Sequence, residues 1–518
     1  MSEAQAMTRT RAGVGGAQET LVPILRELAV DMDTPISVYL KLRGLGPSFL
    51  LESVEGGEHL ARFSMIGVQP RAIIRSWRNR SSRHGTSGPV AVIEEEGSWR
   101  ELPLDGGDVL DVLQEYLPVY APEVDLETLP RFTGGAVGYM GYDLVRSFER
   151  LPDQAPDTLG LPEATFLLAD RVVLYDHVKH RLLVIAHARA GSDESRQEAE
   201  ASLDEMVARL RRPLPAQPFA AQQTGATRGD DEPPPLESAF EREAFERAVR
   251  RTKEYIAAGD IFQAVLSRRA HRRTSARPFD IYRALRRVNP SPYMFYLELP
   301  DGLRIIGSSP EVLVRVEDGV VESRPLAGTR PRGANEAEDR ELEADLLADP
   351  KERAEHVMLV DLARNDLGRV CEYGTVHTPL MMGVERYSHV MHIVSDVQGQ
   401  LAKGQDAFDV LAASFPAGTV SGAPKVRAME IIDALEPEAR GPYAGAVGYF
   451  GYSGNMDTCI TIRTIVMRGD EVYLQAGAGI VADSDPTTEY HETDNKLRAL
   501  SRALALAEQE AQQKGGSK

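Results

Sequence analysis

The sequence predicts a protein of the mixed α/β (α+β) class, built as one large body or as roughly two to three ordinary domains. Its 518 residues, 42% of them hydrophobic, are enough for a sizeable core. Apolar segments of strand length alternate with amphipathic segments of helical length. A glycine-rich segment also occurs twice, as GGAVGYMGY at Gly134–Tyr142 and AGAVGYFGY at Ala444–Tyr452, with seven of nine positions identical. Glycine in a strand permits close backbone approach, so we expect two similar strands in similar surroundings.

Strands are expected to dominate the first half of the chain. Residues 19–45 are predicted as a helix followed by a strand at Ile36–Leu42. The apolar FLLES at Phe49–Ser53 ends in two polar groups, and RFSMIG at Arg62–Gly67 follows a glycine-rich turn. The other expected elements are strands within 69–100 and 164–186, a helix at Val109–Leu117 and a charged amphipathic helix at Asp193–Arg212.

Two compositional shifts suggest boundaries. Residues 1–18 are polar and rich in Gly and Ala without an apolar stretch, which predicts a disordered tail and no signal peptide. The stretch 213–236 is rich in Pro, Gln, Gly and Asp, which indicates a linker or a surface excursion within one fold. We therefore expect an N-terminal region at 19–212, a second region at 237–510 and a tail at 511–518.

Helices and strands alternate in the second half. The pattern predicts helices at Phe240–Ala258, Pro278–Val288, Lys351–Val370 and Glu489–Gln513, with strands at Ile261–Ser267 and within 293–324. The basic run RRAHRR at Arg268–Arg273 is expected to be the solvated end of a strand rather than a contact with a partner subunit.

Composition excludes several functional classes. The net charge of −19 and pI of about 5.2 argue against a nucleic-acid binder, which would present a basic face. No apolar run approaches membrane length, so no membrane association is expected. Cys371 and Cys459 are the only cysteines, too few for a disulfide framework. They favour a reducing compartment, so we expect a cytoplasmic protein.

Two pairs of glutamates are spaced to share a helix face. Glu352 and Glu355 are three residues apart, and so are Glu489 and Glu492, with Lys496 four residues further on. Facing each other, such pairs could hold Mg²⁺, which prefers oxygen ligands and usually takes one or two carboxylates plus an anionic substrate. The alternative is a solvated face with Glu–Lys pairs. The metal interpretation is favoured because the glutamates lie among unusual local sequences, namely DLARND, GTR, GAG and PAGTVSGAPK.

Many further stretches occur in the order found in one known family. From about 240 to 505, and more weakly from about 20 to 190, the sequence resembles the large subunits of anthranilate synthases, within the chorismate-utilising enzyme family. The resemblance rests on FLLES, GDIFQAVLS, NPSPYMFY, GSSPE, RPLAGTR, EHVMLVDLARNDLGRV, YSHVMH, PAGTVSGAPK, YAGAVGYFGY, DTCITIR, QAGAGIVADS and E-x-x-E-x-x-x-K. A single GAG or E-x-x-E would be weak evidence, whereas so many matches in order are specific.

The resemblance implies a fold and a reaction. The family fold is a large α/β body in which two antiparallel sheets stack and are flanked by helices. Chorismate and ammonia give anthranilate and pyruvate: ammonia adds at C2 as the C4 hydroxyl leaves, and the enolpyruvyl group is then eliminated. Glu355 and Glu492 match the metal-binding glutamates of the family, with Glu352 and Glu489 as outer partners. The Mg²⁺ cofactor would act as a Lewis acid and a template at the ring carboxylate.

The resemblance also implies substrate contacts and proton-transfer residues. Glu311 in SSPE matches the proposed donor of a proton to the C4 hydroxyl, and His392 matches an active-site histidine that shuttles a proton or binds substrate. The chorismate contacts that it implies are Gly328, Thr329, Tyr443, Arg463, Gly477, Ala478, Gly479 and Lys496. An arginine fork suits a carboxylate, and glycines leave backbone N–H groups open to approach. Without the resemblance, the glycines would be assigned to plain turns.

Two positions separate this reaction from those of sister enzymes. Relatives that add water to chorismate carry a lysine base at the position of Gln263, and an amide cannot act as that base. Aminodeoxychorismate synthases, which form the para isomer, typically carry a lysine at the position of Ala327. Aminodeoxychorismate synthase is the alternative function. A degenerate, non-enzymatic paralogue is disfavoured because the glutamates and Arg463 are all present.

The resemblance further implies a partner and an inhibitor. No Gly-x-Cys-x-Gly nucleophile turn is present, so ammonia would come from a separate glutamine amidotransferase subunit, in a heterotetramer of two of each subunit. FLLES and NPSPYMFY match the tryptophan feedback site of the family. The residues implied in inhibitor binding are Glu52, Ser53, Pro292, Tyr293 and Met294. Arg62 matches this site less well by spacing.

Overall fold

The computed structural model describes residues 19–30, 32–53, 62–81, 87–95, 97–104, 106–214, 235–387 and 390–515. The predicted tail at 1–18 lies outside the described residues, and so does most of the predicted linker, at 215–234. The predicted tail at 511–518 overlaps the last helix, which ends at Gly515. No helix in the described part of the chain is long and apolar enough to cross a membrane.

Two large sheets form the centre of the molecule, and nearly all of their strands pair antiparallel. The first sheet contains, in spatial order, β20 (Gly422–Ala423), β12 (Gln263–Arg273), β24 (Glu471–Ile480), β23 (Thr464–Arg468), β14 (Leu303–Ser309), β13 (Tyr293–Glu298), β2 (Ser48–Glu52), β3 (Phe63–Val68), β10 (Val172–Asp176), β11 (Arg181–Arg189), β1 (Thr20–Ala29) and β7 (Val119–Tyr120). The second contains β17 (Leu326–Pro331), β19 (Val390–Gln400), β16 (Val320–Ser323), β15 (Val312–Glu317), β22 (Met456–Ile460), β21 (Ala446–Gly451), β8 (Gly135–Met140), β9 (Ala164–Ala169), β4 (Ala72–Ser81), β5 (Ser87–Glu95) and β6 (Ser98–Pro103), with β18 (His377–Arg386) beside β19.

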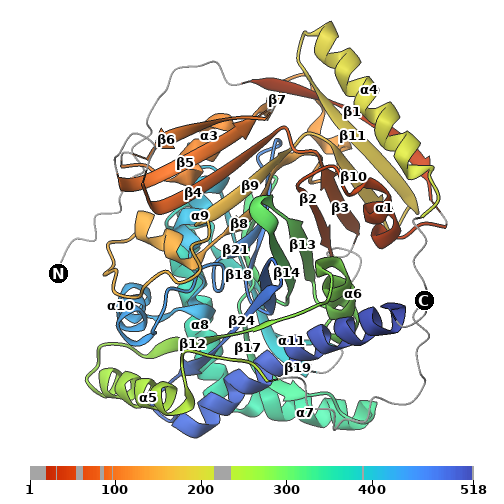
Figure 1. Cartoon of the computed structure of the whole chain (residues 1–518). Helices are drawn as coiled ribbons and strands as arrows, with labels where there is room; N and C mark the ends of the chain where they lie inside the picture. The colour runs from red at the N-terminus through yellow and green to blue at the C-terminus, as the bar shows by residue number, and fades with distance from the viewer. Residues whose placement is uncertain are drawn as a thin grey trace.

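Helices cover the outer faces of both sheets (Figure 1). The α-helices are α1 (Pro35–Leu42), α3 (Val109–Tyr116), α4 (Asp193–Leu210), α5 (Arg242–Ala257), α6 (Pro278–Val288), α7 (Glu336–Ala348), α8 (Pro350–Gly368), α9 (Ala407–Ser414), α10 (Lys425–Leu435) and α11 (Pro486–Gly515). Short 3₁₀ turns are η1 (Leu126–Thr128), η2 (Tyr142–Ser147), η3 (Pro300–Gly302) and η4 (Gly418–Val420). The expected two-layer antiparallel core flanked by helices is confirmed.

The apolar core has three layers. Between the sheets, Phe49 and Phe295 of the first sheet meet Val137 and Leu167 of the second. The other face of the first sheet packs against α1, α4, α6 and α11, and the other face of the second against α3, α8 and α9. Each sheet includes strands from before and after 213–236, so both parts of the chain build one continuous core.

The repeated glycine-rich segments form β8 and β21, which pair directly with each other. Gly138 and Gly448 lie opposite one another in this antiparallel pair. A Cβ at Gly138 would lie 1.9 Å from the Thr165 carbonyl oxygen, and one at Gly448 would lie 2.1 Å from that of Asp457. Neither strand tolerates a side chain here because the next strand approaches too closely, which explains why the motif occurs twice.

The predicted order of the first two elements is wrong. Residues 19–45 form a strand and then a helix, β1 followed by α1. Apolar residues in TLVPILRELA fit a helical spacing, yet nine residues of β1 pair with β11. Thr34 caps α1 by accepting from the Ser37 amide, and Pro35 occupies its first turn. Such a capped start favours a helix and outweighs the pattern that predicted a strand at Ile36–Leu42.

The basic run at Arg268–Arg273 is solvated only at its last residue, Arg273, and its first two arginines are buried. β12 continues to Arg273, and Arg268 and Arg269 are only 5% and 6% exposed. Arg268 is paired with Asp494 of α11, and Arg269 with Glu438. These residues are therefore structural ion pairs, which local sequence cannot reveal because both partners are more than 150 residues away in the chain.

We expect Gly448→Ala to lower the free energy of unfolding by about 1–3 kcal/mol, because its Cβ would overlap a backbone oxygen of the neighbouring strand. Chemical denaturation measures the change. Gly88→Ala in β5 is the matched control, since no atom of the described residues lies within 4 Å of a Cβ there. Equal stability of the Gly448→Ala variant and the wild type would contradict the proposed reason for the repeat.

Candidate active site

Glu355 of α8 lies against the strand that carries Gln263. Asp349 caps α8 by accepting from the amides of Lys351 and Glu352, which sets the start of the helix. The Gln263 amide nitrogen then lies 3.3 Å from Glu355 Oε1. Burial raises the pKa of Glu355, and the charges of Glu352 and Glu492 add to this rise. Glu355 is therefore within electrostatic reach of a glutamate 137 positions later in the chain.

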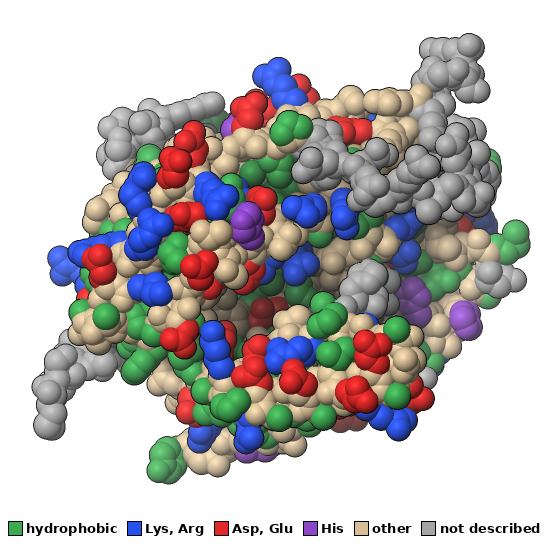
Figure 2. Space-filling model, turned by 90° about the horizontal axis from the view of Figure 1, so that it is seen from below, with side chains coloured by type: hydrophobic (Ala, Val, Ile, Leu, Met, Phe, Trp, Pro, Cys, Tyr) green, Lys and Arg blue, Asp and Glu red, His purple; other side chains and the backbone are tan. Residues whose placement is uncertain are grey.

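The second pair of glutamates lies in the first turns of α11. Lys496 Nζ lies 2.7 Å from Glu492 Oε1 and donates to the Gly477 carbonyl oxygen at 2.8 Å. Burial raises the pKa of Glu489, and the charge of Glu492 raises it further. α8 and α11 thus present their acidic residues to a common region. Figure 2 looks onto the end of the molecule where α5, α7 and α11 lie in Figure 1, and charged side chains surround a hollow in this face.

The carboxylates fit a divalent cation that takes few protein ligands. Among the described residues, no three acidic, histidine or cysteine side chains converge closely enough to hold a metal by themselves. Arg330 Nη1 lies 3.1 Å from Glu352 Oε1, so the Glu352 carboxylate already has an ion-pair partner. Mg²⁺ usually takes one or two carboxylates and completes its shell with water and substrate oxygens. The neighbouring negative charges of Glu355 and Glu492 suit that mode, because a cation between them would relieve their repulsion.

The glycine-rich end of β24 makes room for two polar side chains. Gly477 and Gly479 pair with Ser267 and Val265 of β12. A Cβ at Gly477 would lie 2.8 Å from the Tyr443 hydroxyl, and one at Gly479 would lie 2.7 Å from the Gln263 amide nitrogen. Larger residues would displace these groups, so the strand must be small here. Ala478, between them, points to the opposite face and is fully buried.

Arg463 provides an available positive charge. It has a φ of +51°, which places it in the left-handed region between β22 and β23. Burial lowers the pKa of its guanidinium, and the nearby Tyr443 acts in the opposite direction. Within the described ranges, Arg463 takes part in no ion pair. A buried arginine without a carboxylate partner is suited to binding the carboxylate of a ligand.

Glu311 is placed to act as an acid. It follows β14, and its carbonyl oxygen accepts from the Ile460 amide at 3.0 Å. Burial raises the pKa of Glu311 to about 8, although Thr419 and the charge of Lys496 lower it somewhat. Glu311 therefore carries a proton at neutral pH and can donate it.

His392 of β19 is held in one orientation by β17. Its Nδ1 lies 2.9 Å from the Gly328 carbonyl oxygen and 3.1 Å from the Thr329 hydroxyl. The carbonyl can only accept, so Nδ1 carries the proton and Nε2 is left as an acceptor. Burial lowers the pKa of His392, which keeps it neutral at pH 7. Gly328 has a φ of +67°, and its Cβ would lie 3.1 Å from Glu352 Oε2. The absence of a side chain at Gly328 therefore leaves room for the Glu352 carboxylate.

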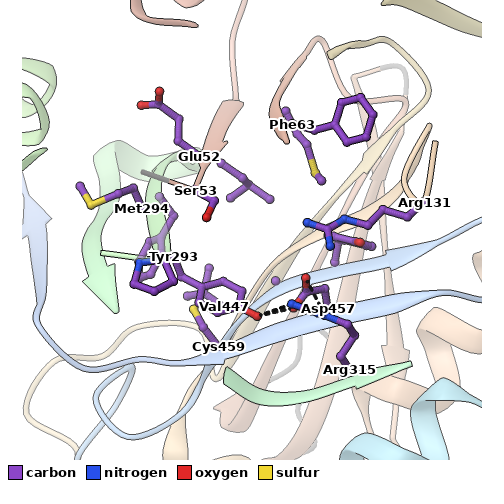
Figure 3. Close-up of a pocket in the computed structure, with 16 residues that line it drawn as sticks. Glu52, Ser53, Phe63, Arg131, Tyr293, Met294, Arg315, Val447, Asp457 and Cys459 are labelled. Carbon is purple, nitrogen blue, oxygen red and sulfur yellow. Dashed lines mark hydrogen bonds and ion pairs between the residues drawn. The ribbon is translucent and has the colours of Figure 1, made fainter. Parts of the chain in front are cut away.

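A second cavity lies between the two sheets, and none of the four predicted metal-site glutamates lines it. Figure 3 shows it, and Glu52, Ser53, Pro292, Tyr293 and Met294 all line it. The carboxylate of Glu52 points away from the cavity and accepts from the Tyr282 hydroxyl at 2.5 Å. Its role there is therefore confined to its backbone. Arg62 does not line this cavity and pairs instead with Asp176 at 3.3 Å.

Sequence reasoning missed the charged wall of this cavity. Asp457 accepts from the Tyr293 hydroxyl at 2.8 Å and pairs with Arg315 at 3.2 Å. Arg131 also lines it, and Figure 3 shows its guanidinium directed towards the centre. Tyr449 belongs to the second glycine-rich repeat, so this motif was a signal for the cavity as well as for the strand pair.

The sequence profile of the chorismate binding enzyme family matches residues 46–502. The chain is 47% identical over 489 residues to anthranilate synthase component 1 of Acetivibrio thermocellus, covering 94% of this chain and 96% of that protein. It is 46% identical over 499 residues to the protein of the same name from Pseudomonas aeruginosa, again covering 94% and 96%. A crystal structure of anthranilate synthase component I from Streptococcus pneumoniae superimposes with a TM-score of 0.72 at 37% identity, covering 91% of this chain and 98% of that one. Sequence and fold agree over almost the whole length, and this chain belongs to the chorismate binding enzyme family.

Proposed function

We propose that this chain is component I of an anthranilate synthase and converts chorismate and ammonia to anthranilate, pyruvate and water. The observation that supports the proposal is a chain of contacts between separate elements: Gln263 donates to Glu355, Lys496 pairs with Glu492, and the charge of Lys496 lowers the pKa of Glu311. Arg463 lies close enough to Tyr443 for the two to interact electrostatically. High identity to proteins named anthranilate synthase component 1 supports it. The reaction would be the first step of tryptophan biosynthesis.

The residues can hold a dianionic substrate between the sheet and the glutamate helices. Arg463 would pair with one carboxylate of chorismate, and Tyr443 and Lys496 would contact its oxygens. Backbone groups of Gly328, Gly477 and Gly479 would lie close to the ring, with Thr329 beside His392. These contacts would contribute to catalysis mainly by holding the ring at one position relative to Glu311.

The first chemical step would form the C2–N bond and break the C4–O bond. Glu311 donates its proton to the departing hydroxyl, so that water leaves instead of hydroxide. The amine gained at C2 releases one proton, which balances the step. In the second step the C2 hydrogen leaves as a proton, the enolpyruvyl C–O bond breaks, and the methylene carbon is protonated to give pyruvate. Neutral His392, with Nε2 open as an acceptor, is placed to move that proton.

Glu355 and Glu492 would hold Mg²⁺, with Glu352 and Glu489 as outer partners. When bound, the cation would draw electron density into the ring carboxylate and orient it.

Two residues distinguish this reaction from its relatives. The Gln263 amide has no basic form at neutral pH, so it positions a nucleophile without activating water. Ala327 of β17 is buried and has no nucleophilic group, which argues against the para-amino product. The chain is also 20% identical to the isochorismate synthase MenF of Escherichia coli, a likeness that concerns the fold alone.

Ammonia would come from a separate glutamine amidotransferase subunit, in an assembly of two chains of each kind in the cytoplasm. Burial raises the pKa of Cys371 to about 11, and burial also raises the pKa of Cys459 strongly. Both side chains are buried, so neither offers the thiolate that glutamine hydrolysis requires.

L-tryptophan would inhibit the enzyme by binding the cavity between the sheets. The apolar surfaces of Pro292, Met294 and Phe63 suit an indole ring, and Asp457 and Arg131 supply opposite charges for an amino acid. Ser53 lines the same space, whereas Glu52 is held by Tyr282.

The function is tested with the isolated chain, chorismate, Mg²⁺ and either ammonium or glutamine. We expect the ortho-amino product, identified by fluorescence and retention time, with ammonium only. Formation of para-aminobenzoate would refute the assigned product, and turnover of glutamine by the single chain would refute the need for a second subunit.

Replacing one metal-binding glutamate is the test of the cation site. We expect Glu355→Gln to reduce kcat/KM by at least about 100-fold and to weaken Mg²⁺ binding measured by calorimetry. Glu341→Gln, exposed on α7, is the matched control and should leave both unchanged. Unaltered Mg²⁺ affinity in Glu355→Gln would remove this residue from the site.

The inhibitor cavity is tested with Ser53→Phe, whose ring would fill the space. We expect the tryptophan concentration for half inhibition to rise about tenfold or more, equivalent to about 1.4 kcal/mol. Activity without tryptophan should remain. Ser147→Phe, exposed in η2, serves as the control. Unchanged inhibition of Ser53→Phe would place the inhibitor elsewhere.

A further inference from the structure

A third cavity lies behind Glu311. It is formed by the start of β15, one face of α8 and the segment from the end of α9 through η4, and its empty volume is about 420 Å³, open solvent included. Glu311 is the only residue it shares with those assigned above to chorismate, Mg²⁺ or tryptophan. The cavity is therefore distinct from both sites but adjoins the proposed acid.

Two sequence motifs without a role so far meet at this cavity. Asp366 ends the DLARND motif on α8, and Lys425 ends the PAGTVSGAPK motif at the start of α10. Lys425 Nζ donates to Asp366 Oδ2 at 2.8 Å and to the Ser414 carbonyl oxygen at 3.3 Å. This ion pair joins α8 to α10 through Asp366, which lines the cavity.

Three buried side-chain oxygens on the cavity lining, Thr419 Oγ1, Asp366 Oδ1 and Ser414 Oγ, are without hydrogen-bond partners among the described residues. Asp366 Oδ1 and Ser414 Oγ form no hydrogen bond within the described part of the chain, and their residues are 6% and 5% exposed. Buried polar groups are nearly always paired with protein or with ordered water. A water molecule needs room and two to four polar partners, and the unpartnered oxygens on this lining offer such partners to ordered water.

Glu311 connects this cavity with the active site. Its carboxyl is close enough to feel the charge of Lys496, which lies among the glutamates, and Glu311 lines the cavity together with Thr419. A proton or a small molecule passing between the two spaces would therefore meet Glu311 first.

We propose that this cavity is a water chamber that takes up the water released from C4 and returns a proton to Glu311. The proposal rests on the proposed function. When Glu311 protonates the hydroxyl and the C4–O bond breaks, the new water moves past the carboxylate into the chamber. Chamber water, hydrogen-bonded to Ser414 and Asp366, then gives Glu311 a proton. This leaves a hydroxide in the chamber, and the proton released by the new amine neutralises it, so atoms and charge balance and the cycle needs no oxidant or reductant.

The chamber is tested by filling it while leaving substrate contacts intact. Ala363 of α8 lines the cavity, and Ala363→Leu would add three carbon atoms there. Ala354→Leu, exposed on the same helix, is the matched control. Two reactions are measured in each variant: chorismate with ammonium to anthranilate, and the isolated C2-amino, enolpyruvyl intermediate to anthranilate and pyruvate. The second reaction requires no loss of the C4 hydroxyl.

We expect Ala363→Leu to lower kcat from chorismate at least about tenfold, with KM for chorismate and ammonium within about twofold and the second reaction unchanged. Ser414→Ala, which removes one water ligand without adding volume, should lower the same kcat about threefold and also spare the second reaction.

Several outcomes would overturn the chamber. Equal loss of both reactions would show a structural role, no loss would show that the cavity is idle, and a raised KM for ammonium would show that it holds ammonia instead. Failure of the wild-type chain to convert either chorismate or the intermediate would refute the proposed function itself, which separates the two hypotheses.

Discussion

A buried ion pair between Arg440 and Glu436 joins the segments on which the active site depends. Arg440 donates to both carboxylate oxygens of Glu436, to the Val420 carbonyl oxygen at 2.7 Å and to the Val265 carbonyl oxygen at 2.6 Å. The guanidinium also stacks 4.5 Å from the ring of Tyr142. A buried pair gains little net stability over an apolar substitute, but losing one partner leaves a desolvated charge. The pair therefore enforces one arrangement of η4, β12 and the end of α10.

Desolvation also shifts the pKa values of the titratable groups in the candidate site. Burial raises the pKa of Glu311 to about 8, and burial lowers the pKa of His392, whose Nδ1 faces the Gly328 carbonyl oxygen. Glu355, in contrast, lies near the carboxylates of Glu352 and Glu492, and this concentration of negative charge favours binding of a cation. Three different surroundings within one region thus produce an acid (Glu311), a proton acceptor (His392) and a pair of neighbouring negative charges (Glu355 and Glu492).

The proposed inhibitor cavity and the proposed acid share two strands. β15 begins directly after Glu311 and carries Arg315, while β22 carries Asp457 and ends at Ile460, whose amide bonds to Glu311. Both strands belong to the second sheet, in a core to which all parts of the chain contribute. A ligand beside Arg315 and Asp457 would therefore contact the strands that hold Glu311 in place, a few residues along each.

The sequence by itself determined the fold class and the family and predicted the residues of the candidate site, because ordered motifs and glycine positions are local chemical requirements. Tertiary structure decided that Thr20–Ala29 is a strand, since β11 supplies its partner, and that the two glycine repeats pair with each other. It alone showed that Arg268 and Arg269 are buried against distant acids, that Glu52 turns away from its cavity, and that Asp366 meets Lys425. Strand pairing and desolvation depend on groups far apart in the chain, and no local pattern records them.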